Sequence, residues 1–311
     1  MGYGGIVAST SKLWPALPLA RWQDTYATLH MWTQIVGKTR LALAPMVNHW
    51  WNVTLYVTAR GLSTAVMPHR QRAFEVEFDF LDHVLALRTS DGATRTLPLA
   101  ARPVADFYAE YLGAVEALGL EHRIRPVPVE TPEAIPFALD RKHAAYDASA
   151  ARDFFQALLQ ADRLLKGFRG HFAGKCSPVH FFWGGFDLAC TRFSGRPAPP
   201  YGGTIPNCPD YVMLEAYSHE CISAGWWPGS GAVSEPAFYA YAYPEPAGLA
   251  QASIRPAAAR YDTTMREFIL PYEAVRTAQN PDEAVLAFLQ STYDAAADLA
   301  VWDRSALDRR R

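Results

Sequence analysis

The chain has 311 residues, of which 50% are hydrophobic and 19% are charged, a balance typical of a folded globular protein. Its formal net charge of -2 gives no electrostatic signature of binding to nucleic acid or to an anionic membrane. The four cysteines form neither a CxxC pair nor the spacing of a zinc site. Because the sequence also lacks a long apolar span and a signal-peptide pattern at its N-terminus, we expect a cytoplasmic protein.

Aromatic residues are unusually frequent, with 9 Trp, 15 Tyr and 16 Phe. Such rigid side chains are typical of a dense core or of an aromatic-lined pocket. At roughly 150 residues per domain, the length favours two units. We predict two α+β halves, residues 1–121 and 122–311, that together form one compact unit.

The first half is predicted to hold an antiparallel meander between two helices. After a lead-in over residues 1–18, apolar residues from Trp22 recur at helical spacing, and Gly37 is a natural end for that helix. A second apolar stripe follows Pro103 and ends at Gly119. Period-two alternation predicts four strands between these helices, over residues 48–60, 74–80, 84–89 and 94–99.

The second half repeats this order after a proline-rich connector, residues 123–136. Asp147 is expected to cap one helix, and Asn280 and Pro281 to begin the last one. The predicted strands cover residues 179–193, 211–217, 224–227 and 238–243. The expected fold class is therefore α+β, with two similar halves, each an antiparallel β-meander covered by an amphipathic helix.

The two halves can be aligned as an internal duplication. His49-Trp50-Trp51 then matches His180-Phe181-Phe182, and His83 matches His219. Few aligned residues are identical, so two unrelated meanders are the alternative. A true duplication would place the paired histidines at equivalent positions around a pocket between the halves.

Histidines carry most of the chemical information, because the sequence contains no HExxH, P-loop, GxSxG or strand-linked GxGxxG motif. Imidazole titrates near neutral pH and binds metals, so converging histidines predict a general acid–base site or a metal centre. We take His49, His180 and His219 as candidate catalytic residues, with hydrogen-bonded structural histidines as the alternative. The pattern names neither a metal nor a cofactor.

Further residues are candidates for binding a substrate. The forked donors of two arginines suit a carboxylate or a phosphate, although pairing of a loop arginine with an internal Asp or Glu is the favoured alternative. Two positions of the first predicted helix lie on one stripe, within reach of one another. The candidate set is His30, Gln34, Trp51, Asp187, Arg192, Arg196 and Trp226.

Three segments are specific enough to indicate kinship: Asn48-His49-Trp50-Trp51, Ser177 to Gly184, and Glu215-Ala216-Tyr217-Ser218-His219-Glu220. In these segments the chain resembles an uncharacterised bacterial family, domain of unknown function 5996. The resemblance extends from about Trp14 to Trp302 and implies that the chain is one complete unit. It implies no catalytic residue, because the family is described only as one of unknown function.

The leading hypothesis is an enzyme acting on a small anionic or aromatic molecule in a histidine-containing aromatic pocket. The alternative is a non-catalytic protein that binds or senses a small molecule, and a structural subunit of an assembly ranks third. The expected partner is a small-molecule ligand or substrate, with no nucleic acid and no membrane, and the expected state is a monomer or a weak homo-oligomer.

Overall fold

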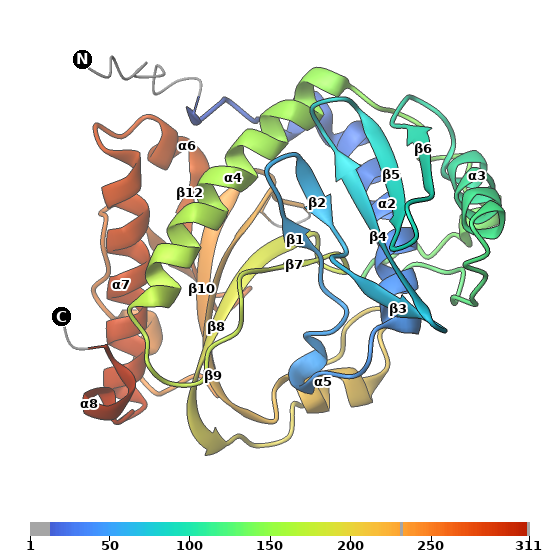
Figure 1. The fold of residues 1–311 in the computed structure, drawn as a ribbon. Coiled ribbons are helices and arrows are strands. Elements are labelled where there is room, and N and C mark those ends of the chain that lie inside the picture. Colours follow the sequence, from blue (N-terminus) through green and yellow to red (C-terminus); the bar gives the residue numbers. More distant parts are fainter. Residues whose placement is uncertain (1–12, 231–232, 310–311) are drawn as a thin grey trace, which may run out of the picture.

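Two antiparallel sheets of six strands each form the frame of the chain in a computed structural model, which describes residues 13–230 and 233–309 (Figure 1). The first sheet has the order β1-β2-β4-β5-β6, and β3 pairs with β4. Its strands are β1 (Tyr56–Val57), β2 (Gly61–Ser63), β3 (Met67–His69), β4 (Arg72–Asp79), β5 (Val84–Thr89) and β6 (Thr94–Pro98). The predicted strands over 74–80, 84–89 and 94–99 are therefore confirmed.

The second sheet has the order β11-β12-β10-β9-β8-β7. The predicted segment 179–193 is a hairpin of two strands, and the strand predicted over 224–227 begins five residues earlier, at His219. The strands are β7 (His180–Phe182), β8 (Asp187–Pro197), β9 (His219–Trp227), β10 (Ala237–Tyr243), β11 (Arg260–Asp262) and β12 (Glu267–Pro271).

Helices cover the sheets and confirm the α+β class. α4 and α7 pack on β8, β9 and β10, whereas α2 and α3 contact the first sheet. The helices are α2 (Leu19–Leu43), α3 (Val104–Ala117), α4 (Ala148–Gly170), α5 (Asp210–Ala216), α6 (Tyr272–Arg276), α7 (Pro281–Leu299) and α8 (Arg304–Leu307), with the 3-10 turns η1 (Asn48–Trp50), η2 (Phe137–Leu139) and η3 (Leu249–Gln251). No helix in the described ranges is both long and apolar enough to cross a membrane.

Alternation along β10 gives the second sheet two different faces. Phe238, Ala240 and Ala242 belong to the main core beneath the helices. Tyr239 and Tyr241 belong to a smaller apolar cluster on the opposite face. Because successive side chains of a strand point to opposite faces, this face, which the large helices leave uncovered, carries the tyrosines. It is the face on which the candidate site lies.

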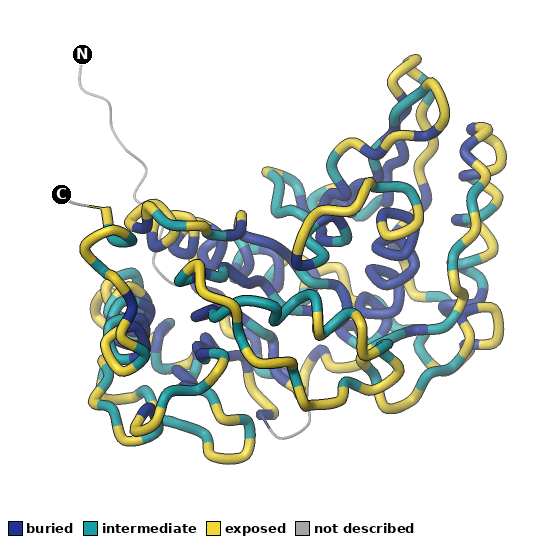
Figure 2. Tube along the Cα trace, turned by 90° about the horizontal axis from the view of Figure 1, so that it is seen from below, coloured by how far each residue is buried: buried dark blue, intermediate teal, exposed yellow. Residues whose placement is uncertain are grey.

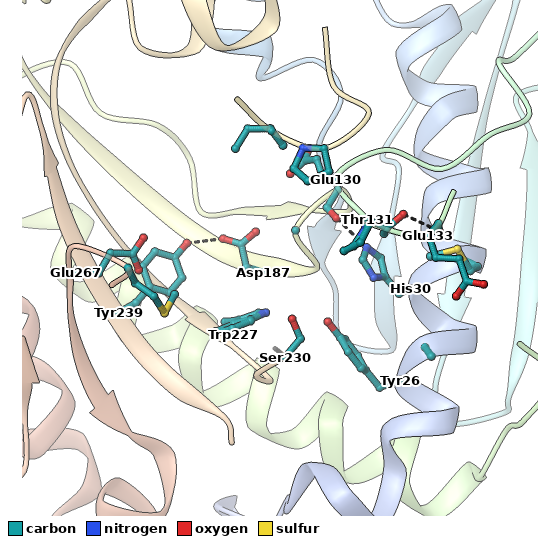
Figure 3. Close-up of a pocket in the computed structure, with 18 of the residues that line it drawn as sticks. Tyr26, His30, Glu130, Thr131, Glu133, Asp187, Trp227, Ser230, Tyr239 and Glu267 are labelled. Carbon is teal, nitrogen blue, oxygen red and sulfur yellow. Dashed lines mark hydrogen bonds between the residues drawn. The ribbon is translucent and has the colours of Figure 1, made fainter. Parts of the chain in front are cut away.

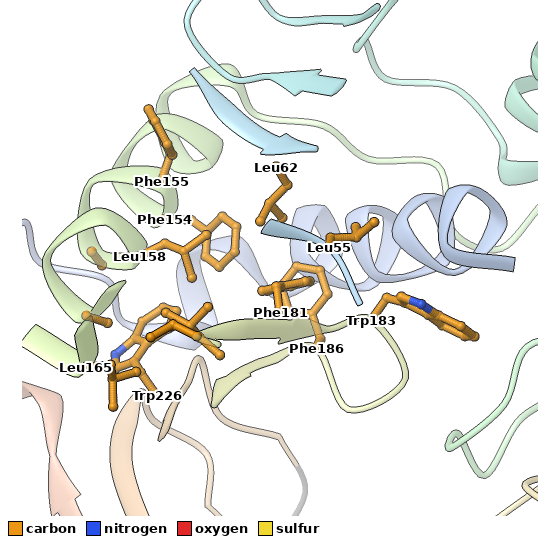
Figure 4. Close-up of a cluster of buried hydrophobic side chains, with 14 of the residues drawn as sticks. Leu55, Leu62, Phe154, Phe155, Leu158, Leu165, Phe181, Trp183, Phe186 and Trp226 are labelled. Carbon is orange, nitrogen blue, oxygen red and sulfur yellow. The ribbon is translucent and has the colours of Figure 1, made fainter. Parts of the chain in front are cut away.

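The two sheets share one hydrophobic core. Leu55, just before β1, and Phe181 of β7 exchange two backbone hydrogen bonds of 2.9 Å. The ring of Phe181 contacts Phe186, and both lie against Phe154 of α4 (Figure 4). Buried positions follow the central helices and strands, whereas the outer loops are exposed (Figure 2). Residues from both sheets belong to a single buried cluster.

Three predicted elements were wrong. Of residues 48–60 only Tyr56–Val57 is a strand, β1, and the residues before it form η1 and turns, because His49 and Trp50 have φ angles of 59° and 62°, which no strand permits. Residues 211–217 lie largely in helix α5. The first helix continues through Gly37, where the missing side chain makes room for Trp183: a Cβ atom there would lie 2.3 Å from its indole ring.

The residues paired by the proposed duplication do not occupy equivalent positions. His49 lies in a 3-10 turn, whereas His180 begins a strand. His83 lies in the turn between β4 and β5, with a φ of 52°, whereas His219 begins β9. Most of the predicted lead-in, residues 1–12, lies outside the described residues.

Candidate functional site

A cavity of about 720 Å³ opens on the tyrosine-bearing face of the second sheet, between β8–β10, α2 and the connector that precedes α4 (Figure 3). Its size suits a small organic molecule. Glu267 and Tyr239 lie on one side, His30 and Tyr26 on the other, with Asp187 between them. We call it the acidic cavity; its polar and aromatic lining residues include Tyr26, His30, Glu130, His143, Asp187, Tyr217, Trp227, Tyr239, Tyr241 and Glu267.

Asp187, the first residue of β8, is held by a tyrosine two strands away. The Tyr239 hydroxyl of β10 donates a hydrogen bond to Asp187 Oδ2 across the intervening strand β9. Gly225 of β9 makes this crossing possible, because a Cβ atom there would lie 2.5 Å from the Tyr239 hydroxyl. Burial raises the pKa of Asp187 to about 6, and the hydrogen bond from Tyr239 opposes that shift.

Two further carboxyl groups share the acidic cavity. Burial, together with the charge of Asp187, raises the pKa of Glu130 to about 7. The same two causes raise the pKa of Glu267 to about 7. Glu130 as a whole residue is exposed, but its carboxylate is turned onto the backbone of Gly184, where a Cβ atom would lie 2.0 Å from Oε1. Near neutral pH these groups are therefore able to both donate and accept protons.

The turn that presents Asp187 is fixed by α2. His30 Nε2 lies 2.8 Å from the carbonyl oxygen of Gly184 and donates to it. Burial lowers the pKa of His30 to about 4, so its imidazole is neutral at physiological pH. Within the turn, Phe186 has a φ of 58°, which is unfavourable for a bulky side chain. Such conformations persist only where the surrounding structure imposes them, and they concentrate at functional sites.

Gln34, one helical turn from His30, positions the opposite wall. Its side-chain amide donates to the carbonyl oxygen of Val129 at 2.7 Å and accepts from the Val129 N–H at 2.8 Å. This pair of bonds pins the connector next to Glu130, which itself has a φ of 58°. His30 and Gln34, which lie on one stripe of α2, thus both position the site: His30 lies in the cavity wall and Gln34 lies behind it.

An imidazole–carboxylate pair lies at the rim. His143 Nδ1 is 2.7 Å from Oδ2 of Asp140, and the Asp140 side chain is fully buried. The other Asp140 oxygen accepts the backbone N–H groups of Lys142 and His143 at 3.1 Å. Asp140 therefore orients the ring and fixes the proton on Nδ1, which leaves Nε2 as a proton acceptor. His143 lines the acidic cavity.

The three histidines proposed as catalytic lie elsewhere. The ring centroids of His49 and His219 are 5.8 Å apart. His49 Nδ1 donates to the carbonyl oxygens of Glu215 and Ala216, and its Nε2 accepts from Lys175 Nζ at 2.8 Å. His49, His219 and Lys175 thus form a polar cluster outside the acidic cavity. Neither histidine lines the acidic cavity.

His180 is separated from that pair by Trp51, whose ring centroid lies 5.2 Å from His49 and 6.0 Å from His180. The imidazole of His180 is fully buried, and burial lowers its pKa to about 3. Neither of its ring nitrogens has a hydrogen-bond partner among the described residues. His180 is thus an uncharged core residue, and the three histidines do not converge on one cavity.

Among the predicted substrate-binding residues, the arginines and Trp226 are placed away from the acidic cavity. Arg192 is buried on the helix side of β8, with its guanidinium carbon 3.5 Å from the ring centroid of Phe168. Arg196 binds Glu220 and the C-terminal end of α7. Trp226 is fully buried against α4. Alternation explains these positions, since neighbouring strand residues face opposite sides of the sheet.

Charge in the acidic cavity is one-sided. The described lining residues include four acidic side chains and no lysine or arginine; Glu133, at the rim, is paired with Lys142, which leaves Asp187, Glu130 and Glu267. In residues 13–230 and 233–309, no group of three or more His, Cys, Asp or Glu side chains is arranged to hold a metal ion. The arrangement is suited to proton transfer and to attracting positive charge.

Sequence reasoning missed His143, Glu130, Tyr239 and Glu267. One signal was available for His143: Asp140 precedes it by three residues, a spacing at which a side chain returns to its own turn. Glu130 lies in the connector, and Tyr239 and Glu267 are ordinary strand residues. Only the pairing of β8, β9, β10 and β12 brings the last two beside Asp187.

Comparison with known proteins gives one family. No curated protein and no solved structure matches the chain significantly. A family model described as "Family of unknown function (DUF5996)" matches residues 14–309, nearly the whole chain. The chain therefore belongs to the DUF5996 family, a family of unknown function.

Proposed function

We propose that the chain is an enzyme that binds a small amine-bearing molecule in the acidic cavity and transfers protons to and from it. The observation that carries this proposal is the meeting of the Asp140-oriented His143 with Asp187, Glu130 and Glu267 in one tyrosine-lined cavity. Groups with pKa values near 7 in a concave site are typical of general acid–base catalysis.

From the sequence we expected an anionic or aromatic molecule; the charge of the acidic cavity favours a cationic ligand over an anionic one. Glu133 at the rim is paired with Lys142, but the carboxyl groups of Asp187, Glu130 and Glu267 form no ion pair among the described residues, so an anion bound between them would be repelled. Tyr26, Trp227 and Tyr239 add aromatic surface, and aromatic faces attract ammonium groups. A protonated amine would also lower the raised pKa values of the carboxyl groups that it contacts.

The roles of the catalytic groups follow from their surroundings. Asp187 has the lowest pKa of the three carboxyls and accepts a hydrogen bond from Tyr239, so it is assigned as a base. Glu130 and Glu267, with pKa values of about 7, are the candidate acids. His143 is a second base, oriented by Asp140. The proposal needs no metal.

The alternative is a binding protein that returns its ligand unchanged. The same aromatic and acidic lining would recognise an amine without turning it over. The strained turn at Phe186 and the His143–Asp140 pair favour the enzyme, because recognition of a cation alone requires no oriented imidazole.

Calorimetric titration of the purified chain with tyramine, glucosamine, spermidine and choline, each beside a matched alcohol or carboxylate, tests the proposal. We expect at least one amine to bind and its neutral or anionic analogue to bind at least tenfold more weakly. Asp187→Asn should abolish that preference, whereas Asp282→Asn, at a surface pair with Arg163, should retain it.

Mass spectrometry of the bound amine after incubation separates the two functions. A changed amine, formed by wild type and not by His143→Gln, supports the enzyme. Recovery of the amine unchanged in every case would establish the binding protein in its place. Preferential binding of the carboxylates would contradict both.

A further inference from the structure

A second cavity of about 610 Å³ adjoins the acidic cavity. The two share four lining residues: Tyr217, Tyr241, Met265 and Glu267. The two cavities therefore lie side by side on the same face of the second sheet. We call the second space the tyrosine cavity; its other lining residues include Tyr201, Gly203, Tyr243, Glu245 and Arg266.

The walls of the tyrosine cavity are stacked phenol rings. The ring of Tyr201 stacks on that of Tyr217, with centroids 4.8 Å apart and planes at 15°. The ring of Tyr243 lies 5.0 Å from Tyr217, and its hydroxyl donates to the carbonyl oxygen of Pro199 at 2.9 Å. These contacts hold the rings in place before any ligand arrives, which lowers the entropic cost of binding.

Charge differs between the two cavities. In the tyrosine cavity Arg266 and Glu245 form an ion pair of 2.8 Å, so each neutralises the other, and the remaining acid, Glu267, lies in the wall shared with the acidic cavity. Phenol faces and hydroxyl groups remain as the recognition elements. Such a surface suits an uncharged ring that carries hydroxyl groups, because its C–H face packs on the aromatic ring and its hydroxyls meet the phenol oxygens.

We infer that the ligand is an amino sugar of at least two linked rings, with its amine in the acidic cavity and its second ring against Tyr201 and Tyr243 in the tyrosine cavity. This inference rests on the proposed function for the position of the amine. It adds the substrate class and assigns Tyr201 as a residue that determines specificity for the second ring.

Three probes test the inference by calorimetric titration: glucosamine, the β-1,4-linked dimer of glucosamine, and cellobiose, which has two rings and no amine. We expect the dimer to bind at least tenfold more tightly than glucosamine, and cellobiose to bind weakly or not at all. Tyr201→Ala should reduce the affinity for the dimer about tenfold and leave that for glucosamine unchanged. Tyr211→Ala, at an exposed tyrosine of α5, is the matched control and should change neither.

The outcomes separate this inference from the proposed function. Equal affinity for dimer and monomer, or equal loss of both in Tyr201→Ala, would overturn the two-ring ligand while leaving the amine site standing. If tyramine or spermidine binds and neither glucosamine nor its dimer does, the substrate class is overturned and the amine site stands. Failure of every amine to bind would overturn the proposed function itself. Circular dichroism of each variant shows that it is folded before titration.

Discussion

Burial acts on the carboxyl groups of the acidic cavity in a way that makes folding stability depend on pH. The folded pKa of Glu267 is about 7, above its ordinary value of 4.5, because burial and the charge of Asp187 favour the neutral form. A raised folded pKa gives a stabilising contribution that is complete below about pH 4.5 and is lost as pH rises through 7. Ionisation of Glu267 at higher pH therefore lowers the folding stability and, at the same time, strengthens the attraction of the cavity for a cation.

Glu267→Gln tests this dependence, because glutamine has the same shape and does not ionise. We expect the melting temperature of the variant, relative to wild type, to rise by about 2 °C between pH 5 and pH 8. Differential scanning calorimetry at four pH values measures it. Glu116→Gln, on the exposed side of α3, controls for a generic effect of removing a charge. A Glu267→Gln difference that stays constant with pH would show that Glu267 is not buried in this way.

At the scale of elements, the neighbouring strands β8, β9 and β10 position the carboxylate of Asp187. Gly225 of β9 allows the Tyr239 side chain to cross that strand and reach it. A Cβ atom at position 225 would lie 2.5 Å from the Tyr239 hydroxyl and 2.2 Å from the carbonyl oxygen of Leu188. The second atom belongs to the backbone of β8 and is unable to move without separating the strands. Gly225 is therefore required by the close approach of β8, β9 and β10.

Gly225→Ala should destabilise the fold by about 1–3 kcal/mol through overpacking. It should also weaken amine binding, since Tyr239 is displaced from Asp187. Gly113→Ala is the matched control: that glycine lies within α3 with no atom within 4 Å of its added Cβ, so the change should stabilise by about 0.5–1 kcal/mol. Urea unfolding measures both variants. Equal stability of the two would refute the packing argument.

Local pattern was sufficient for some elements and insufficient for others. α4 and α7 begin at side chains that cap them, Asp147 and Asn280, and such signals act within one turn. In β4 apolar and charged residues alternate because Phe74, Val76 and Phe78 belong to the hydrophobic core, whereas the residues between them are acidic. Around His49 the same alternation belongs to a turn, in which His49 and Trp51 pack on Phe193 and Trp50 packs on Tyr211. Alternating hydrophobicity indicates only that every second side chain is buried, and a turn is able to bury its side chains in the same pattern.

For the whole molecule, the single core predicts that both sheets unfold together. Phe181 is fully buried and joins the backbone of β7 to Leu55 beside the first sheet. The predicted boundary at residues 121/122 therefore does not coincide with a break in the buried cluster. We expect far-ultraviolet circular dichroism and tryptophan fluorescence to follow one transition in urea.

Phe181→Ala should lower the free energy of unfolding by about 3–5 kcal/mol and keep that transition single. Leu139→Ala, at a side chain that is 72% exposed, is the control and should change it by less than about 0.5 kcal/mol. Two separate transitions, in wild type or in Phe181→Ala, would mean that the halves fold independently.

The sequence by itself determined the α+β class, the helices capped by Asp147 and Asn280, and the strands over residues 74–80, 84–89 and 94–99, and it placed His30 and Asp187 among the candidate residues. These follow from signals that act within a few residues: periodicity, caps and turns. Tertiary structure alone decided that Asp187, Tyr239, Glu130 and His143 surround one cavity and that His180 does not. The physical reason is that their proximity depends on strand order and on which face each residue occupies, and a shift of one residue reverses the face.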